Sequence, residues 1–392
     1  MQNTEKYIEV CKKMLEWLKK SNWQSYDPYD AGLSPFAKFL PNRGWWILQH
    51  LLRLSPVNFR PILGIQKQVN AKGLAHSMQA CLKLYRLTNE PEMSLTAQQL
   101  ADWLLQLAKW EGDRCSWNYP FPYITRGLVC RKGTNIVNNS FVALALLDAY
   151  EQFGTKKYLQ TALAATRFIF HDIGYFDYKN GQICFYYAPK AKDTLTIHNA
   201  NMVAATLFYR TGKIINNDSY VSLSSAAARY TLDHQLSNGL WHYAERSNSR
   251  WIDCFHTGFV LDSLMLMTNS ENMELFQAAI NRGMESFKHF LDNSGRIIHY
   301  FDKKYPEDIR SYAQFIQTAT LLSKFDSEWL NLAVSAANYA INTMISNNGI
   351  CYYRRYKYMV IRTPFIRWSF GPMLYALSQL VLALNSDKIS RD

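Results

Sequence analysis

Along most of the chain, hydrophobic and polar residues are spaced in a pattern that predicts helices arranged in pairs. In each pair, the first segment is apolar nearly all round and the second carries one apolar stripe at helical spacing. This difference is expected when an inner helix is surrounded by protein and an outer helix faces solvent on one side. The predicted pairs are residues 71–87 with 95–110, 138–154 with 156–173, 197–212 with 219–236, 255–268 with 273–291, and 309–325 with 329–345.

Two further helical segments, one of the outer type and one of the inner type, have no partner next to them in the sequence. Residues 5–20 form an amphipathic pattern with no inner helix before it, and the apolar residues 368–384 have no outer helix after them. A linear array of hairpins would leave both end faces in need of caps. Pairing these two segments instead closes a ring of six hairpins. We therefore predict an all-α toroid over residues 1–392, organised as a single domain.

The connections from each outer helix to the next inner helix share a pattern. A small or turn-forming residue is followed by closely spaced aromatics, as in SWNYPFPY, GQICFYYAP, GLWHYAERS, GRIIHYFDKKYP and GICYYRRYKY. One tyrosine recurs in each, at separations of 67, 57, 57 and 53 residues: Tyr119, Tyr186, Tyr243, Tyr300 and Tyr353. In a closed ring these connections lie at one mouth. We expect an aromatic-lined concavity there, which is the usual form of a ligand site.

Polar residues recur at the starts of the predicted inner helices, where they would converge on the axis of the ring. The N–H groups at helix starts favour carboxylate or phosphate, and the planar fork of arginine binds such groups through two hydrogen bonds. Together with the loop aromatics, they predict a site for an acidic sugar. The predicted substrate-binding residues are Trp117, Tyr119, Asn139, Tyr186, Asn201, Trp241, Tyr243, Tyr300, Gln314, Tyr353, Arg355, Arg367 and Trp368.

The stretch WIDCFHTGFVL places Asp253 three residues before His256, so that both side chains lie on one helical face. His198 stands at the equivalent entrance one hairpin earlier, with Asn201 three residues after it. Asp308 occupies a third entrance. We predict Asp253, His256, His198 and Asp308 as the catalytic acid/base candidates. Helix capping is the alternative interpretation of the two aspartates.

Two kinds of sugar chemistry fit these residues. Abstraction of the proton next to a uronate carboxylate, in elimination or C5 epimerisation, needs a base such as His or Tyr and a cation beside the carboxylate. Glycoside hydrolysis needs two carboxyl groups at a suitable separation. Asp253 and Asp308 are available for that role, with Glu245 and Asp177 in reserve. The sequence leaves hydrolysis, elimination and epimerisation open.

The ring of six hairpins resembles the (α/α)6 toroid of many glycoside hydrolases, polysaccharide lyases and sugar epimerases. More narrowly, SNGLWHYAE, WIDCFHTGFVLDSL, DIRSYAQFIQTATLL and FIRWSFGPMLYALSQL resemble an uncharacterised group of bacterial polysaccharide-biosynthesis proteins of the VpsJ type, over about residues 110–384. The resemblance implies a carbohydrate-active enzyme that works on a polysaccharide, or on its lipid-linked precursor, during cell-surface glycan biosynthesis. It implies no particular reaction.

Composition and charge restrict the class of protein and the kind of partner. Hydrophobic residues make up 48% of the chain and charged residues 19%, which suffices for a large core and argues against disorder. The formal net charge of +12 favours anionic partners. We expect an anionic oligosaccharide or polysaccharide as the ligand and no nucleic acid. Peripheral contact with a membrane or with polysaccharide-assembly proteins is a further expectation.

The seven cysteines are irregularly spaced and form no CxxC motif, which argues against a disulfide framework and a structural zinc site. We therefore expect neither a metal nor a cofactor. The N-terminal segment has lysines throughout and lacks the uninterrupted apolar core of a signal peptide. These features predict a reduced, cytoplasmic protein.

Two alternative functions come from other classes of protein. The toroids of terpenoid cyclases and protein prenyltransferases are lined with aromatics, but the chain lacks the DxDD and DDxxD motifs. Asp253, Cys254 and His256 echo the prenyltransferase zinc ligands, although Cys254 should point away from the other two. The second alternative is a non-catalytic glycan-binding or assembly protein, in which the acid/base residues would be dispensable.

Overall fold

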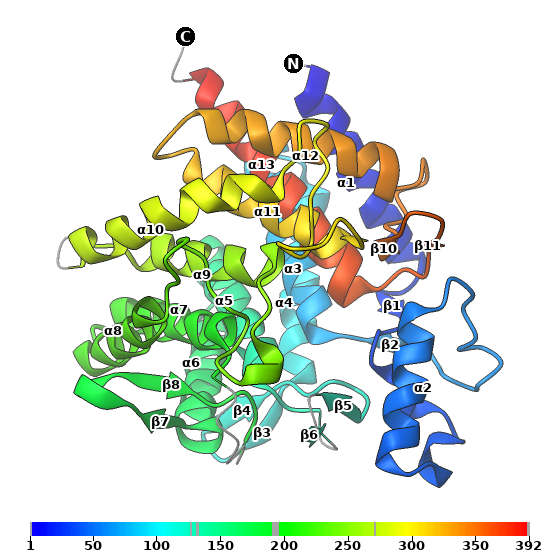
Figure 1. Cartoon of the computed structure of the whole chain (residues 1–392), viewed down its shortest axis with the longest axis horizontal. Coiled ribbons are helices and arrows are strands. Elements are labelled where there is room, and N and C mark those ends of the chain that lie inside the picture. Colours follow the sequence, from blue (N-terminus) through cyan, green and yellow to red (C-terminus); the bar gives the residue numbers. More distant parts are fainter. Residues whose placement is uncertain (1, 126–127, 131–132, 190–195, 270–271, 390–392) are drawn as a thin grey trace.

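The computed structural model of the chain describes residues 2–125, 128–130, 133–189, 196–269 and 272–389. Six helices form an inner ring in which each contacts the next. Figure 1 shows the red α13 beside the cyan α3, the contact that closes the ring. The inner helices are α3 (Ala71–Thr88), α5 (Ile136–Phe153), α7 (His198–Ile215), α9 (Cys254–Met267), α11 (Ile309–Leu322) and α13 (Gly371–Ile389).

Each inner helix carries an outer helix on its far side, which completes the predicted (α/α)6 toroid. The N-terminal helix α1 (Gln2–Lys20) packs on α13, so the predicted pairing of the two ends of the chain is confirmed. The other outer helices pack on the inner helix that precedes them in sequence. They are α4 (Pro91–Leu107), α6 (Lys156–Phe168), α8 (Asp218–Asp233), α10 (Met273–Phe287) and α12 (Glu328–Met344).

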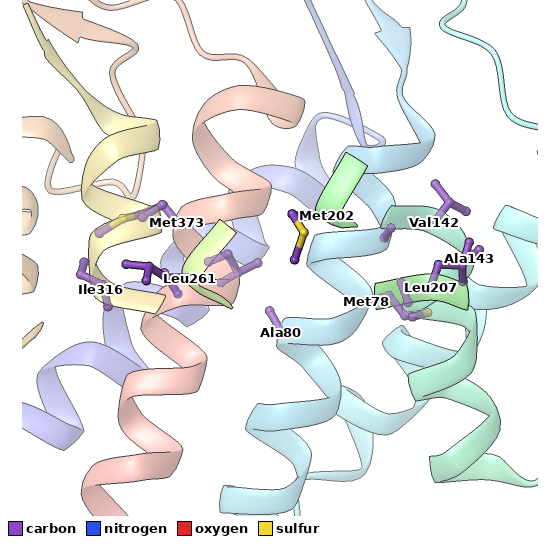
Figure 2. Close-up of a cluster of buried hydrophobic side chains, with 14 of the residues drawn as sticks. Met78, Ala80, Val142, Ala143, Met202, Leu207, Leu261, Ile316 and Met373 are labelled. Atoms are coloured by element: carbon purple, nitrogen blue, oxygen red, sulfur yellow. The ribbon is translucent and has the colours of Figure 1, made fainter. Parts of the chain in front are cut away.

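The inner helices are buried on nearly all sides, as their apolar sequences predict. Figure 2 shows Leu261, Ile316 and Met373 packed together from α9, α11 and α13, and all three are fully buried. Gly258 allows α9 and α11 to approach closely, since a Cβ there would lie 2.5 Å from Cγ of Gln314. No helix within the described ranges is long and apolar enough to cross a membrane.

Short strands, which the periodicity did not predict, lie in the connections at the mouth where the inner helices begin. They form small antiparallel pairs and one three-stranded sheet of order β11-β10-β9. The pairs are β1 (Gln24–Ser25) with β2 (Gln68–Val69), β3 (Lys109–Glu111) with β4 (Arg114–Ser116), β5 (Tyr123–Thr125) with β6 (Leu128–Cys130), and β7 (Tyr175–Asp177) with β8 (Ile183–Phe185). The three-stranded sheet is made of β9 (Glu307–Asp308), β10 (Arg354–Arg355) and β11 (Val360–Ile361).

One helix, α2 (Asn42–Leu54), lies outside the six hairpins, in the long connection from α1 to α3. Figure 1 shows it standing away from the ring. Two 3-10 turns precede it: η1 (Asp30–Leu33) and η2 (Ala37–Phe39). Trp45 and Leu52 of α2 pack inward on a small core of their own, separate from the core of the toroid. The helical periodicity of the six pairs gave no indication of this element.

Candidate active site

The start of α9 holds a carboxylate and an imidazole in direct contact. Asp253 caps the helix: its Oδ1 accepts a hydrogen bond of 2.8 Å from the backbone N–H of His256. Its Oδ2 accepts from Nε1 of Trp251 at 2.8 Å and from Nδ1 of His256 at 2.6 Å. An ionised carboxylate only accepts, so Nδ1 carries a proton, and in the neutral form of the ring the lone pair is on Nε2. Capping and acid/base pairing are therefore properties of the same aspartate.

The two side chains of this pair differ in their exposure to solvent, and the pKa of the carboxyl group is shifted. Burial acts to raise the pKa of Asp253, but the adjacent His256 and its hydrogen bonds lower it well below the ordinary value. The Asp253 side chain is 1% exposed, whereas that of His256 is 21% exposed. Tyr243 meets the imidazole edge-on with the ring centroids 4.4 Å apart, and Tyr243 is itself stacked on Trp251. The imidazole is thus a fixed ring presented towards the mouth.

Asp308 occupies the equivalent position at α11 but is enclosed by arginines. Its carboxylate accepts hydrogen bonds from Arg310 Nε at 2.9 Å, Arg310 Nη2 at 2.7 Å and Arg354 Nε at 2.6 Å. It also caps the backbone N–H of Arg310. The side chain is completely buried, and despite that burial the two arginines hold its pKa far below the usual range. In this geometry Asp308 anchors two cations, and its catalytic role stays a prediction.

The guanidinium groups at the mouth are stacked on aromatic rings. Arg310 lies 3.9 Å from the ring centroid of Trp368 and 5.1 Å from that of Phe255. Arg367 lies 4.5 Å from the centroid of Tyr119 and donates from Nη1 to its hydroxyl at 3.2 Å. Such contacts orient both a cation and a ring.

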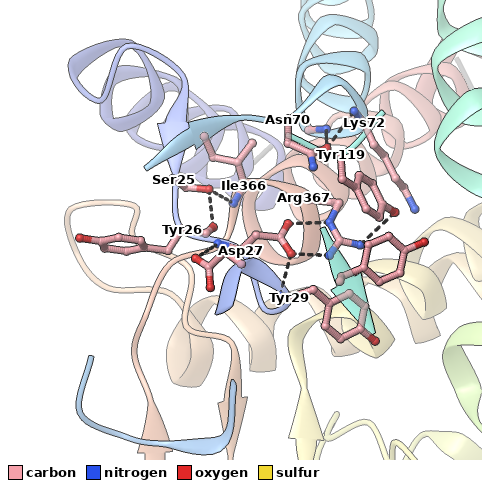
Figure 3. Close-up of polar contacts among 12 residues, drawn as sticks. Ser25, Tyr26, Asp27, Tyr29, Asn70, Lys72, Tyr119, Ile366 and Arg367 are labelled. Carbon is pink, nitrogen blue, oxygen red and sulfur yellow. Dashed lines mark hydrogen bonds and ion pairs between the residues drawn. The ribbon is translucent and has the colours of Figure 1, made fainter. Parts of the chain in front are cut away.

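Arg367, a predicted substrate contact, is already paired with a carboxylate. Its Nε and Nη2 donate to the two carboxylate oxygens of Asp27 at 2.7 and 2.5 Å. Figure 3 shows this bidentate pair between the segment that follows α1 and the helical turn η7 (Ile366–Phe370), which immediately precedes α13. The charge of Arg367 is therefore balanced by Asp27 and its guanidinium orients Tyr119, while contact with a substrate stays a prediction.

Lys72, which the sequence analysis missed, lies beside these arginines at the second position of α3. The residue is only 6% exposed, and its Nζ lies 3.9 Å from the ring centroid of Phe141 and 5.7 Å from that of Phe259. Within the described ranges the amine has no hydrogen-bond or ion-pair acceptor. Burial, followed by the charges of Arg367 and Arg310, lowers its pKa well below the ordinary value. Its one available clue in the sequence is that Arg310 also stands second in its inner helix.

The start of α7 holds a second histidine–carboxylate pair. His198 Nε2 lies 2.9 Å from Oε1 of Glu245, and its Nδ1 lies 3.4 Å from Oγ1 of Thr231. The imidazole is 1% exposed and the Glu245 side chain 23%. Burial lowers the pKa of His198, and the hydrogen bond from His198 lowers the pKa of Glu245. In this pair the carboxylate, not the predicted histidine, reaches the mouth.

Several residues predicted to touch substrate are buried in the wall instead. The indole N–H groups of Trp117 and Trp241 donate to backbone carbonyls. The amides of Asn139 and Asn201 accept from backbone N–H groups of the loops packed against them. Tyr353 is fully buried. Because their polar atoms and rings serve the fold, these residues shape the mouth without facing it.

The remaining predicted contacts divide by exposure. Tyr186, Tyr300 and Arg355 are partly exposed. Tyr119, Tyr243 and Trp368 are between 6% and 8% exposed and carry the cation and imidazole contacts described above. Gln314 is buried further along α11, where its amide donates to Asp262 at 2.7 Å.

A metal ion has no evident place among these groups. Within the described ranges no three His, Cys, Asp or Glu side chains cluster in a way that could hold one. Cys254 is fully buried, and its thiol donates to the backbone oxygen of Ser311 at 3.7 Å. Burial raises the pKa of this thiol, which disfavours the thiolate that a metal would bind.

Solved structures share the fold over nearly the whole chain. A GH76 α-mannanase of Bacteroides thetaiotaomicron has a TM-score of 0.67 at 15% identity and covers 98% of this chain and 97% of its own. A polysaccharide lyase has 0.63 at 11% identity and covers 98% of both chains. The cellobiose 2-epimerase of Bacillus thermoamylovorans has 0.62 at 10% identity, covering 82% of this chain and 90% of its own.

These similarities show an (α/α)6 toroid, and at such low identity they show the fold alone. No protein-family model and no curated protein sequence matches the chain. The resemblance to the VpsJ type therefore stays a prediction.

Proposed function

We propose that the chain is a carbohydrate-active enzyme that removes the proton next to the carboxylate of an acidic sugar, with His256 as the base. The observation that carries the proposal is the Asp253–His256 pair, in which a buried carboxylate fixes Nδ1 at 2.6 Å and the ring is presented towards the mouth. A neutral imidazole held in one tautomer is suited to accept a proton at Nε2.

The two predicted catalytic carboxylates are buried and already hydrogen-bonded, which favours proton abstraction over hydrolysis. Hydrolysis of a glycoside by acid and base requires two carboxyl groups that both reach the sugar. Asp253 is 1% exposed and Asp308 is not exposed at all, and both are engaged by cationic or N–H donors. Of the two reserve carboxylates, Glu245 is partly exposed and bonded to His198, and Asp177 is exposed in β7.

Lys72 is suited to bind the carboxylate of the sugar. Its amine lies among Arg310, Arg367 and two aromatic rings without an acceptor of its own in the described part of the chain. A bound carboxylate would favour the charged ammonium and raise the lowered pKa of Lys72 again. Neutralising the carboxylate in turn makes the neighbouring C–H easier to deprotonate, because the resulting enolate is stabilised.

Two reactions follow from this first step. In epimerisation, a proton returns to the opposite face of the same carbon. In elimination, the bond from the next carbon to the glycosidic oxygen breaks, and that oxygen takes a proton and leaves as an alcohol. The substrate we propose is an acidic polysaccharide or a lipid-linked glycan precursor in cell-surface polysaccharide biosynthesis, which agrees with a net charge of +12.

A panel of acidic oligosaccharides tests this proposal with three readouts. Elimination creates an unsaturated sugar with ultraviolet absorbance, epimerisation brings solvent deuterium into the sugar, and hydrolysis creates reducing ends. We expect one of the first two, and we expect Lys72→Met to raise KM for acidic sugars about tenfold or more through loss of a charge-assisted contact. New reducing ends alone would replace proton abstraction by hydrolysis. Binding without any product would favour a non-catalytic glycan-binding protein.

A further inference from the structure

The connection that contains α2 exposes an unusual amount of apolar surface. Ten of the twenty exposed large hydrophobic side chains identified within the described ranges lie in residues 36–62. The most exposed are Ile62 at 80%, Phe39 at 77% and Leu51 at 63%. Concentrated apolar surface of this kind marks an interaction site. The α2 surface, as we call it, comprises Phe36, Phe39, Leu40, Trp46, Ile47, Leu51, Leu54, Val57, Phe59 and Ile62.

Helix α2 has apolar residues on both its inner and its outer side. Trp45 and Leu52 face inward and are buried, whereas Trp46, Ile47 and Leu51 face outward. A helix that is apolar on both sides is stable where both sides meet apolar surroundings. The outer side borders a hollow of about 550 Å³ lined mainly by α2 and the segment that follows it. This side is therefore an apolar surface that is open for docking.

The charged residues of the segment that carries the α2 surface are all positive. No acidic residue occurs between Asp30 and Glu90 in the sequence. Lys38, Arg43 and Lys67 are exposed in or beside the patch. Apolar side chains combined with basic residues and no acidic ones suit a uniformly negative, amphipathic surface.

We propose that the α2 surface docks on an anionic lipid bilayer. Its aromatic and aliphatic side chains enter the boundary between headgroups and acyl chains, and Lys38, Arg43 and Lys67 contact lipid phosphates. A single protein partner would have to cover ten apolar side chains that are spread over a helix and two loops. It would also have to place an acidic group at each basic residue. A bilayer supplies both properties everywhere, which is why we favour it.

Helix α2 lies at the end of the toroid that holds the candidate active site. The connection from α1 to α3 lies at the same end of the toroid as the other outer-to-inner connections, and therefore at the mouth that holds His256 and Lys72. Gln49 of α2 fixes the helix to β5 of the neighbouring connection: its Nε2 donates to the carbonyl of Ile124 at 2.7 Å, and its Oε1 accepts from the Ile124 N–H at 3.1 Å. Docking would thus hold the mouth near the membrane surface, where a lipid-linked glycan is found.

Flotation of the full chain with lipid vesicles tests the inference without any substrate. We expect binding to vesicles of phosphatidylcholine with phosphatidylglycerol, weaker binding to phosphatidylcholine alone, and weakening by salt. The variant Phe39→Ser/Leu51→Ser/Ile62→Ser removes three large apolar side chains and should weaken binding by about two orders of magnitude or more. Lys38→Glu/Arg43→Glu/Lys67→Glu should abolish the preference for the anionic lipid.

A matched control removes equally exposed apolar side chains from elsewhere. Leu95 and Leu275 lie on outer helices and are 59% and 52% exposed. Leu95→Ser/Leu275→Ser should leave vesicle binding unchanged. Because the triple serine variant alters only exposed side chains, it should melt at the temperature of the wild type and keep its activity on a water-soluble oligosaccharide.

Four results would overturn the inference: no binding to anionic vesicles, equal binding by the triple serine variant, a concentration-dependent dimer in lipid-free buffer that this variant abolishes, or capture of a specific protein in preference to vesicles. The dimer would assign the α2 surface to a second copy of the chain. Capture of a specific protein in preference to vesicles would assign it to a protein partner. Vesicle binding and turnover of a soluble oligosaccharide are measured separately, so failure of docking is distinguishable from failure of the proposed reaction.

Discussion

Two histidine–carboxylate pairs lie at neighbouring entrances of the toroid and are built in opposite ways. At α9, the carboxylate of Asp253 is 1% exposed and the imidazole of His256 is 21% exposed. At α7, the imidazole of His198 is 1% exposed and the carboxylate of Glu245 is 23% exposed. The same two chemical groups are thus presented in reverse order to the mouth. In the function we propose, orientation rather than residue type decides which group can exchange a proton with the sugar.

The local bonding explains the reversal. Asp253 is drawn inward because it caps α9 and accepts the indole N–H of Trp251. His198 is drawn inward because its two ring nitrogens lie against Thr231 and Glu245. One pair is therefore suited to proton transfer, and the other ties a loop to an inner helix.

The largest expected effect comes from removing the outward imidazole. His256→Ala should lower kcat by about 10²- to 10⁴-fold, the usual contribution of a general base, while thermal unfolding shows an intact fold. His242→Ala is the matched control, since His242 is also partly exposed at this mouth, 4.0 Å from Glu245. Turnover at the wild-type rate in His256→Ala would reduce the Asp253–His256 pair to a helix cap.

The order of the two variants should be reversed for stability: His198→Ala should lower the free energy of unfolding more than His256→Ala does. His198→Ala empties a buried position and removes the partner of Glu245, so we expect the free energy of unfolding to fall by about 2–4 kcal/mol. His256→Ala removes a partly exposed ring and should cost about 1 kcal/mol or less. Urea unfolding of both variants measures the difference. Equal losses would mean that the two imidazoles are equally structural.

The smallest effect is a change in the pH dependence of stability. The lowered pKa of Glu245 stabilises the fold above its ordinary pKa of 4.5, and this contribution is lost as the pH falls through the lowered value. His198, whose pKa is lowered by burial, also disfavours the fold as the pH falls below its ordinary value of 6.5, because the unfolded chain then binds a proton that the folded one does not.

Unfolding by urea between about pH 7 and about pH 4 checks this prediction. We expect wild-type stability to decrease towards acid, and we expect His198→Gln to show a shallower decrease. An identical slope in the variant would place the acid sensitivity at other groups.

The closed ring could be predicted because it depends on periodicity that is local to each segment. Residues 5–20 and 368–384 each lacked a partner of the other kind, and the only economical solution paired them, as α1 and α13 are paired in the structure. Helix α2 escaped prediction because it belongs to no repeat and is apolar on both sides. Organisation as a single domain stays a prediction.

The site was less predictable because burial and pairing depend on residues far apart in sequence. Arg367 has its charge balanced by Asp27, which precedes it by 340 residues. Asp308 is enclosed by Arg310 nearby and by Arg354 from another connection. Spacing alone placed Asp253 beside His256, since three residues in a helix suffice for that. It could not tell which member of each pair faces outward.

Chemical rescue by imidazole tests the central claim most directly. In His256→Ala, added imidazole can enter the partly exposed position beside Asp253 and act as the base, so the account predicts that turnover of the acidic oligosaccharide rises with imidazole concentration. In His198→Ala the vacated space is closed from solvent, and no rescue is expected. Rescue of His198→Ala but not of His256→Ala would contradict the assignment of the base.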